Sequence, residues 1–153
     1  MRRLAGAAAL VAVGLVGGAA GSHAMSTNRP AAIAPAQVEV ITCHIEWDAQ
    51  ARAPRLDRGS GSGCSGVWGT HVDARGRVVV DHASDPVISI EVTPDEAAVA
   101  RGISAGPSGG GNTTKLTVHD SRVRRALDLS SRSDASRLGS SSGWWLVITH
   151  DAR

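Results

Sequence analysis

The sequence predicts an α+β protein: a mainly antiparallel β-sheet of about six strands, with one or two short helices on one face and a single disulfide. Short segments that alternate apolar and polar residues recur along the chain, and turn residues separate them, which is typical of antiparallel strands. Helix signals occur at only two short places. Two cysteines follow an N-terminus of the export type, which favours a disulfide bond over free thiols.

The first 24 residues are expected to be a secretory signal peptide. Two arginines precede an uncharged apolar run, Leu4 to Ala20, and Ser22-His23-Ala24 offers a small-x-small cleavage site. The run is mostly Ala and Gly, and it is shorter than the ~20 residues of a membrane-spanning helix. We therefore expect cleavage, with a retained anchor as the alternative.

Behind the signal peptide we expect a disordered lead-in at residues 25–37 and a single small, β-rich secreted domain at residues 38–153. The lead-in is largely Ala, Pro, Ser and Asn and has no hydrophobic periodicity. The remaining chain is long enough for one modest core. Arg greatly outnumbers Lys, and Ala, Gly and Val are frequent as well. This composition indicates a GC-rich, actinobacterial-like bacterial source.

The mature chain is expected to be electrically neutral. Of the 16 basic residues, Arg2 and Arg3 leave with the signal peptide, so 14 basic residues remain against 14 acidic ones. Nucleic acids and anionic membranes attract proteins with an excess of Lys and Arg, so neither is an expected partner. The basic stretch at residues 122–137 is interrupted by Asp128 and Asp134, and we interpret it as a solvated face, with a polyanion site as the alternative.

Six strands are predicted. The first places Cys43, Ile45 and Trp47 on one side and polar residues on the other, as in a half-buried strand. The second and third form a hairpin that turns at Asp73-Ala74-Arg75-Gly76, with Gly where a positive φ is needed. The predicted strands are Val38 to Trp47, Val67 to Val72, Arg77 to His82, Val87 to Val92, Lys115 to His119 and Trp144 to His150.

The first predicted helix runs from Pro94 to Arg101. Thr93 can cap its free amides, Pro94 fits the first helical position, and Glu96 can reach back to complete a capping box. Gly102 then provides a left-handed stop.

The second predicted helix follows a cap at Asp120 or Ser121, because the apolar residues at 123, 126 and 127 have helical spacing. Long polar or glycine-rich loops are predicted at residues 49–63 and 104–112.

The last predicted strand requires a second layer. Trp144 to Ile148 are all apolar, and successive side chains of a strand point to opposite faces, so both faces need cover. The two helices can supply that layer, which favours a sheet with helices on one side over a plain two-sheet sandwich. An immunoglobulin-type sandwich is disfavoured further, because Cys43 and Cys64 are close in sequence and Tyr is absent.

Cys43 and Cys64 are predicted to form a structural disulfide worth about 3 kcal/mol. A catalytic thiol or a metal pair is the alternative, but there is no Cys-x-x-Cys spacing. The glycine-rich segment at 61–66 matches a dinucleotide fingerprint by letters only, since a strand follows it where a helix is needed. No cofactor and no metal site are predicted.

Four histidines, His71, His82, His119 and His150, lie beside an Asp or one residue from it. Three of them are the last residue of a predicted strand, so they could meet at one edge of the sheet. Together with a nearby Ser, they could supply the catalytic groups of a hydrolase. No Gly-x-Ser-x-Gly elbow lies between a predicted strand and a predicted helix, and the His-Glu-x-x-His motif is absent. We therefore favour solvated histidines at strand ends, with a zinc or copper site and hydrolase machinery as alternatives.

The candidate binding residues are Gly106, Ser108, Gly109, Gly110, Asn112 and Trp144. Long glycine-rich connections in compact domains are often recognition elements, and an exposed Trp often marks a contact surface. The sequence therefore favours a secreted, non-enzymatic binding module for an extracellular protein or a cell-envelope component. A small secreted hydrolase that uses the strand-end His and Asp residues is the alternative.

Overall fold

The computed structural model describes residues 37–58, 63–84 and 86–152, and within these ranges nine strands pair in antiparallel fashion. The strands are β1 (Val38–Asp48), β2 (Ala53–Asp57), β3 (Val67–Val72), β4 (Val78–His82), β5 (Val87–Pro94), β6 (Ile103–Gly110), β7 (Thr113–Asp120), β8 (Arg125–Ala126) and β9 (Gly143–Asp151). The helices are α1 (Glu96–Ala100), α2 (Arg132–Ala135) and the 3-10 helix η1 (Ser136–Leu138). The predicted signal peptide and residues 25–36 of the predicted lead-in lie outside the described residues.

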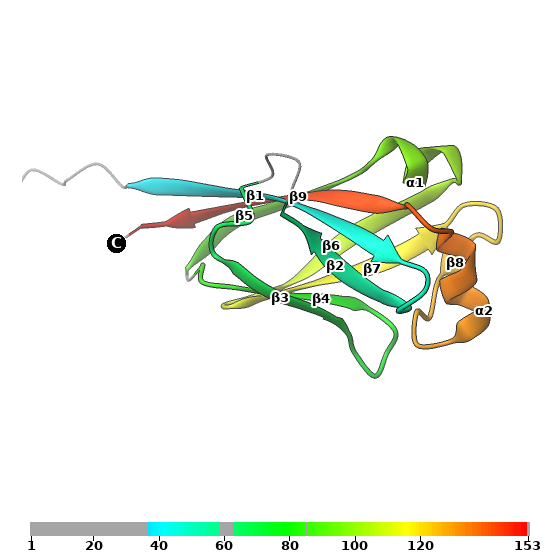
Figure 1. Ribbon diagram of the computed structural model, residues 1–153. Coiled ribbons are helices and arrows are strands. Elements are labelled where there is room, and N and C mark those ends of the chain that lie inside the picture. The colour runs from blue at the N-terminus through cyan, green and yellow to red at the C-terminus, as the bar shows by residue number, and fades with distance from the viewer. Residues whose placement is uncertain (1–36, 59–62, 85, 153) are drawn as a thin grey trace, which may run out of the picture. The chain divides into compact units, whose positions relative to one another are not determined.

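The strands form two sheets, which lie one above the other in Figure 1. The β1 sheet has the order β2-β1-β9-β5, and the β7 sheet has the order β3-β4-β7-β6, with β8 pairing β7. Both sheets contribute fully buried residues to one hydrophobic cluster, among them Ile45, Leu146 and Ile148 from the first and Leu116 and Val118 from the second. The core therefore lies between the two sheets.

The structure confirms a mainly antiparallel β fold with a few short helices and one disulfide. The source of the second layer differs from the expectation, because the β7 sheet rather than the helices covers the β1 sheet. Both α1 and α2 lie at one end of the sheets, away from the C-terminus (Figure 1). An apolar face can be covered by a sheet or by helices, and the alternation along one strand does not distinguish the two.

All six predicted strands are present, with ends that differ by at most two residues from those expected. The hairpin between β3 and β4 also forms as predicted: Gly76 has φ +70°, and its N–H donates to the Asp73 carbonyl. The Asp73 carboxylate accepts hydrogen bonds from the amides of Arg75 and Arg77, which fastens the turn to its own backbone.

Strand β9 is covered on its inner face only. Trp144, Leu146 and Ile148 are fully buried toward the core, whereas Trp145 and Val147 are half-buried on the outer face of the β1 sheet. The prediction that both faces are buried is therefore wrong for the outer face. No helix layer covers this face, and the His44 ring shields Trp145 in part.

Helix α1 begins later than predicted. Thr93 and Pro94 continue the ladder of β5 opposite Trp145 and Trp144, so neither of them starts the helix. Asp95 is the N-cap instead, and its carboxylate accepts from the amide of Ala98 at 2.7 Å. The predicted stop is present, since Gly102 has φ +71°.

The predicted second helix, with its cap at Asp120 or Ser121, is wrong. The chain turns after β7, where Arg124 has φ +54°, and residues 125–126 form β8. The Asp120 carboxylate accepts from the Arg122 amide and so supports a turn, not a helix cap. The helical residues lie further on, in α2 and η1; among the described residues, no helix is long and apolar enough to cross a membrane.

Two segments that were expected to be loops contain strands. β2 lies within the predicted loop 49–63, and β6 occupies most of the predicted loop 104–112. Each lies at one edge of its sheet and pairs with one neighbour in the strand order, β1 and β7 respectively. Pro54 and Pro107 fit such strands, because an edge strand leaves half of its amides without a ladder partner.

The predicted disulfide is present and joins the two sheets. Cys43 in β1 is bonded to Cys64, which precedes β3, and both residues are buried. The bond ties the centre of the β1 sheet to the start of the β7 sheet.

Candidate functional site

A cleft with a volume of about 510 Å³ lies between β5 and β6, the edge strands of the two sheets. Pro86, Val87, Ile88, Ser89 and Ile90 form one wall, and Pro107, Ser108, Gly109, Gly110 and Gly111 form the other. All of these lining residues are uncharged. The volume lies within the range that is typical of ligand-binding pockets in proteins.

The wall from β5 combines apolar and hydroxyl groups. Ile88 is 57% exposed, which is unusual for a large apolar side chain, and Ser89 is exposed beside it. The opposite wall is mainly glycine backbone. Such a wall lets another polypeptide backbone approach closely, because no side chain intervenes.

The glycines of β6 differ in what the fold requires of them. Gly109 has φ +126°, and a Cβ atom there would lie 2.8 Å from the Thr113 carbonyl oxygen, so the fold itself requires glycine. Gly106 and Gly110 have no left-handed φ, and a Cβ atom at either position would meet nothing within 4 Å. Packing within the protein therefore does not explain glycine at these two positions.

The predicted binding residues fall into three groups. Ser108, Gly109 and Gly110 line the cleft. Gly106 lies on β6 outside the lining, and Asn112 lies in the turn after it, where its carbonyl accepts from the His82 amide. Trp144 is fully buried in the core and presents no surface, because it occupies an inward position of β9.

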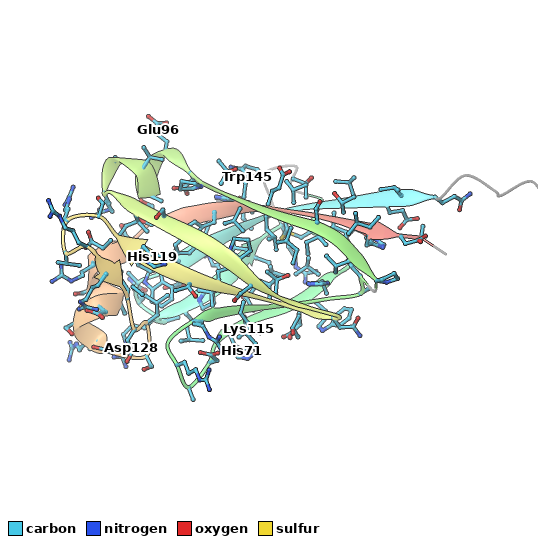
Figure 2. The ribbon with its side chains drawn as sticks, turned by 180° about the vertical axis from the view of Figure 1, so that it is seen from behind. His71, Glu96, Lys115, His119, Asp128 and Trp145 are labelled. Atoms are coloured by element: carbon cyan, nitrogen blue, oxygen red, sulfur yellow. A yellow bond between two sulfur atoms is a disulfide. The ribbon has the colours of Figure 1, made fainter. Side chains whose placement is uncertain are left out.

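Of the four histidines that neighbour an Asp in the sequence, His71, His119 and His150 lie apart, whereas His82 and His150 are near enough to interact. His71 pairs with Val79 of β4, and Val79 pairs with Lys115 of β7, so His71 is level with Lys115 in the sheet. His119 lies four residues further along β7, so the two histidines are about 13 Å apart along the strand direction. Figure 2 shows His71 beside the β3–β4 hairpin and His119 toward the end that carries α2. His150 lies in the other sheet, where its Nε2 atom is 3.7 Å from Glu39.

Among the contacts of the described residues, none of these histidines meets the carboxylate of the Asp expected from the sequence, although His150 Nδ1 lies 3.3 Å from the Asp151 carbonyl oxygen. The side chain of His71 faces Asp81 at 3.6 Å, and Asp73 binds Arg77 instead. In the other three pairs the two residues are adjacent on a strand, and adjacent side chains point to opposite faces. Proximity in the sequence therefore does not assemble a His–Asp couple here.

His82 and His150 are not solvated as predicted: His82 is fully buried, and the His150 side chain is only 12% exposed. The Nδ1 atom of His82 accepts from the Ser84 amide at 3.4 Å, so Nε2 carries the proton and donates to the Thr114 hydroxyl at 3.0 Å. Burial lowers the pKa of His82, and the nearby His150 lowers it further, against an opposing effect of Asp81. His82 is a neutral, structural histidine.

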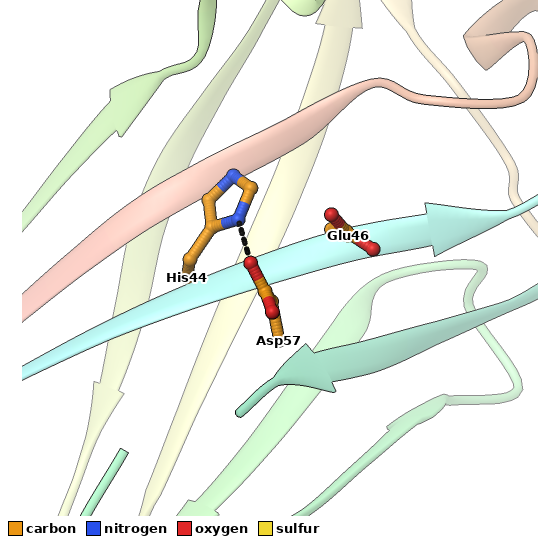
Figure 3. A group of neighbouring side chains, drawn as sticks. All are labelled: His44, Glu46 and Asp57. Atoms are coloured by element: carbon orange, nitrogen blue, oxygen red, sulfur yellow. Dashed lines mark hydrogen bonds and ion pairs between the residues drawn. The ribbon is translucent and has the colours of Figure 1, made fainter. Parts of the chain in front are cut away.

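A second polar cluster lies on the outer face of the β1 sheet, around His44. Its Nδ1 atom is 3.3 Å from Asp57 Oδ2, and its Nε2 atom is 3.4 Å from Asp95 Oδ2. The imidazole stacks on the Trp145 ring, with centroids 4.6 Å apart. Figure 3 shows His44 and Asp57 with Glu46, the next residue on the same face of β1.

Sequence reasoning missed this cluster because it searched for an acid next to each histidine. Asp57 and Asp95 are 13 and 51 residues away from His44, and only strand pairing and the start of α1 bring them near it. The available signal was the alternation of β1, which places His44 and Glu46 together on the polar face.

No protein-family model, no curated protein and no solved structure matches this chain. The functional argument therefore depends on the residues and geometry of this molecule.

Proposed function

We propose that the protein is a secreted, non-enzymatic binding module that holds an extended, uncharged polypeptide segment of an extracellular or cell-envelope partner in the cleft between β5 and β6. The supporting observation is a cleft whose two walls are both edge strands, one of them mainly glycine backbone. Edge strands carry backbone donors and acceptors that no neighbouring strand uses, and an added strand can pair with them.

The chemistry of the lining supports this class of occupant. The lining residues supply backbone amides and carbonyls, two serine hydroxyls and the exposed Ile88 side chain, and none of them is charged. Pro107 has no N–H and so interrupts the row of donors on β6, which limits pairing with unrelated strands. Selectivity for the bound segment would then come from apolar contacts with Ile88 and from the open space in the cleft beside Gly110.

The test uses two glycines of β6 as a matched pair. A library of random 10-residue peptides is panned on the purified protein, and the affinity of enriched peptides is measured for the wild type, Gly110→Val and Gly106→Val by fluorescence anisotropy. Both positions have open space and an ordinary φ, so both variants should fold, but only Gly110 lines the cleft. We expect Gly110→Val to weaken binding about 10-fold or more, at about 1.4 kcal/mol for each factor of ten, and Gly106→Val to leave it unchanged.

The contact site is checked by amide chemical-shift changes, which should concentrate on residues 88–90 and 108–110. Equal affinity of the selected peptides for the wild type and Gly110→Val would contradict the proposal, as would enrichment of no peptide. If sedimentation shows a dimer that Gly110→Val dissociates, a second copy of the chain occupies the cleft instead of a partner segment.

A further inference from the structure

The ligand atoms of His44, Glu46 and Asp57 lie within 4.8 Å of one another. His44 and Asp57 are directly opposite in the β1–β2 ladder, and Glu46 lies two residues along β1 on the same face (Figure 3). We propose that these three side chains bind a divalent transition-metal ion of the zinc class, with Asp95 as the positioning residue for His44. This site lies on the outer face of the β1 sheet, outside the cleft, and does not depend on the proposed peptide binding.

The spacing between His44 and Asp57 also fits two ligands of one shared ion. Charge-assisted hydrogen bonds between nitrogen and a carboxylate are usually about 2.7–2.9 Å long, whereas the separation between Nδ1 and Oδ2 is 3.3 Å. Two ligands at about 2.1 Å from a tetrahedral zinc ion are separated by about 3.4 Å. An ion can therefore be inserted between these two atoms with little movement of either strand.

Asp95 fixes the imidazole in the orientation that a metal ligand needs. One of its oxygens caps α1 through the Ala98 amide, and the other lies 3.4 Å from His44 Nε2. Because the cap holds this carboxylate, it can accept a hydrogen bond from Nε2–H in the tautomer whose Nδ1 lone pair is available to a metal ion. Carboxylate–histidine–metal arrangements of this kind are usual in metalloproteins. Trp145 stacks on the ring and restricts its rotation.

The donor set indicates the class of metal. An imidazole nitrogen with two carboxylates suits zinc and similar first-row ions, whereas Ca²⁺ and Mg²⁺ prefer oxygen ligands alone. Three carboxylates, those of Glu46, Asp57 and Asp95, lie around the imidazole, and Arg55 is paired with Glu46. Arg55 is 63% exposed, so a dication can replace it as the partner of Glu46 at little cost.

The test is calorimetric titration of the untagged, purified protein with ZnCl₂. We expect one zinc ion per chain, and at least 100-fold weaker binding for His44→Ala and for Asp57→Asn. The matched control is His71→Ala, which removes a histidine that faces a single carboxylate, Asp81, in the other sheet. Its zinc affinity should equal that of the wild type. Circular dichroism checks that each variant folds.

The Asp95→Asn variant distinguishes the role of Asp95 in positioning His44 from its role in folding as the N-cap of α1. Asn is as good an N-cap as Asp, so α1 and the unfolding midpoint should be retained. Loss of the carboxylate that orients His44 should weaken zinc binding about 10- to 100-fold. Replacement of zinc by Co²⁺ should give the visible absorption bands of a tetrahedral site in the wild type.

The proposal is overturned if the wild type binds no zinc, or if His44→Ala and Asp57→Asn, both folded, bind it as the wild type does. Peptide binding by the cleft is measured without metal, so failure of one proposal leaves the test of the other intact.

Discussion

Trp144 and Trp145 are neighbours in the sequence and have opposite environments, because they lie on opposite faces of β9. Trp144 is fully buried between the sheets, and its indole nitrogen is buried without a hydrogen-bond partner among the described residues. Trp145 is half-buried and stacks on His44. At the scale of the residue, position on the strand decides the role of each ring.

Trp144→Ala is expected to lower the free energy of unfolding by about 3–5 kcal/mol, because it leaves a large cavity in the core. Trp145→Ala should cost less than about 2 kcal/mol, since that ring is only partly buried and its removal leaves no closed cavity in the core. Urea unfolding followed by circular dichroism measures both. Equal losses would show that the two rings do not occupy the environments described.

His82 makes stability depend on pH. Its pKa is lowered in the folded protein by burial, from an ordinary value of 6.5, so below that pH the unfolded chain binds a proton that the folded protein does not. Stability should therefore fall as the pH drops below about 6.5, by at most about 1.4 kcal/mol per pH unit for this group. The free energy of unfolding is measured between pH 7.5 and 5.5 for the wild type, His82→Gln and the exposed control His119→Gln. The loss should be smaller for His82→Gln and unchanged for His119→Gln.

At the scale of the element, pairing with a neighbour makes strands of segments whose composition does not predict them. β6 contains three glycines and a proline and has little intrinsic strand preference, yet it forms eight ladder pairs with β7. β2 likewise contains Pro54 and charged residues. Both are edge strands, where one partner strand suffices and local propensity says little.

Ion pairs around Asp134, a residue of α2, tie the segment after β7 together. Asp134 is buried, accepts two hydrogen bonds from Arg125 and one from the Asp128 amide, and lies 3.8 Å from Arg137. These contacts, with Arg125 as the largest cause, lower the pKa of Asp134 to about 2. Part of the basic stretch is therefore engaged with a carboxylate of the same stretch.

Asp134→Asn is expected to lower the free energy of unfolding by about 1–3 kcal/mol at neutral pH, because it weakens hydrogen bonds to a charged group. The stabilisation by Asp134 is present above pH 3.8 and is lost as the pH falls toward about 2. Wild type and variant should therefore converge in acid. Glu91→Gln, at an exposed position of β5, is the control and should change stability by less than about 0.5 kcal/mol. A difference between wild type and Asp134→Asn that does not shrink between pH 4 and pH 2 would contradict this account.

At the scale of the whole molecule, the disulfide connects the two layers. Cys43 lies in the β1 sheet and Cys64 at the entrance to the β7 sheet, so the bond limits how far the layers can separate in the unfolded chain. It is also what an oxidising compartment would produce, in agreement with the proposed export.

Replacing both cysteines by alanine is expected to lower the free energy of unfolding by about 3 kcal/mol, measured by urea unfolding against the wild type. If export follows the sequence prediction, N-terminal sequencing of the protein from the medium should begin near Met25, and its mass should lie two protons below that of the dithiol. An intact leader on a protein with two free thiols would contradict export.

The sequence alone predicted six strands, the β3–β4 turn, the helical stop at Gly102 and the disulfide, because these depend on alternation, turn residues and cysteine chemistry within short segments. It also pointed to Ser108, Gly109 and Gly110, which line the cleft. Only the tertiary structure decided that the strands divide into two sheets, that β2 and β6 form their edges, and that His44 meets Asp57 and Asp95. The physical reason is that these features depend on which distant segments pair, and residues far apart in a chain carry no local signal of pairing.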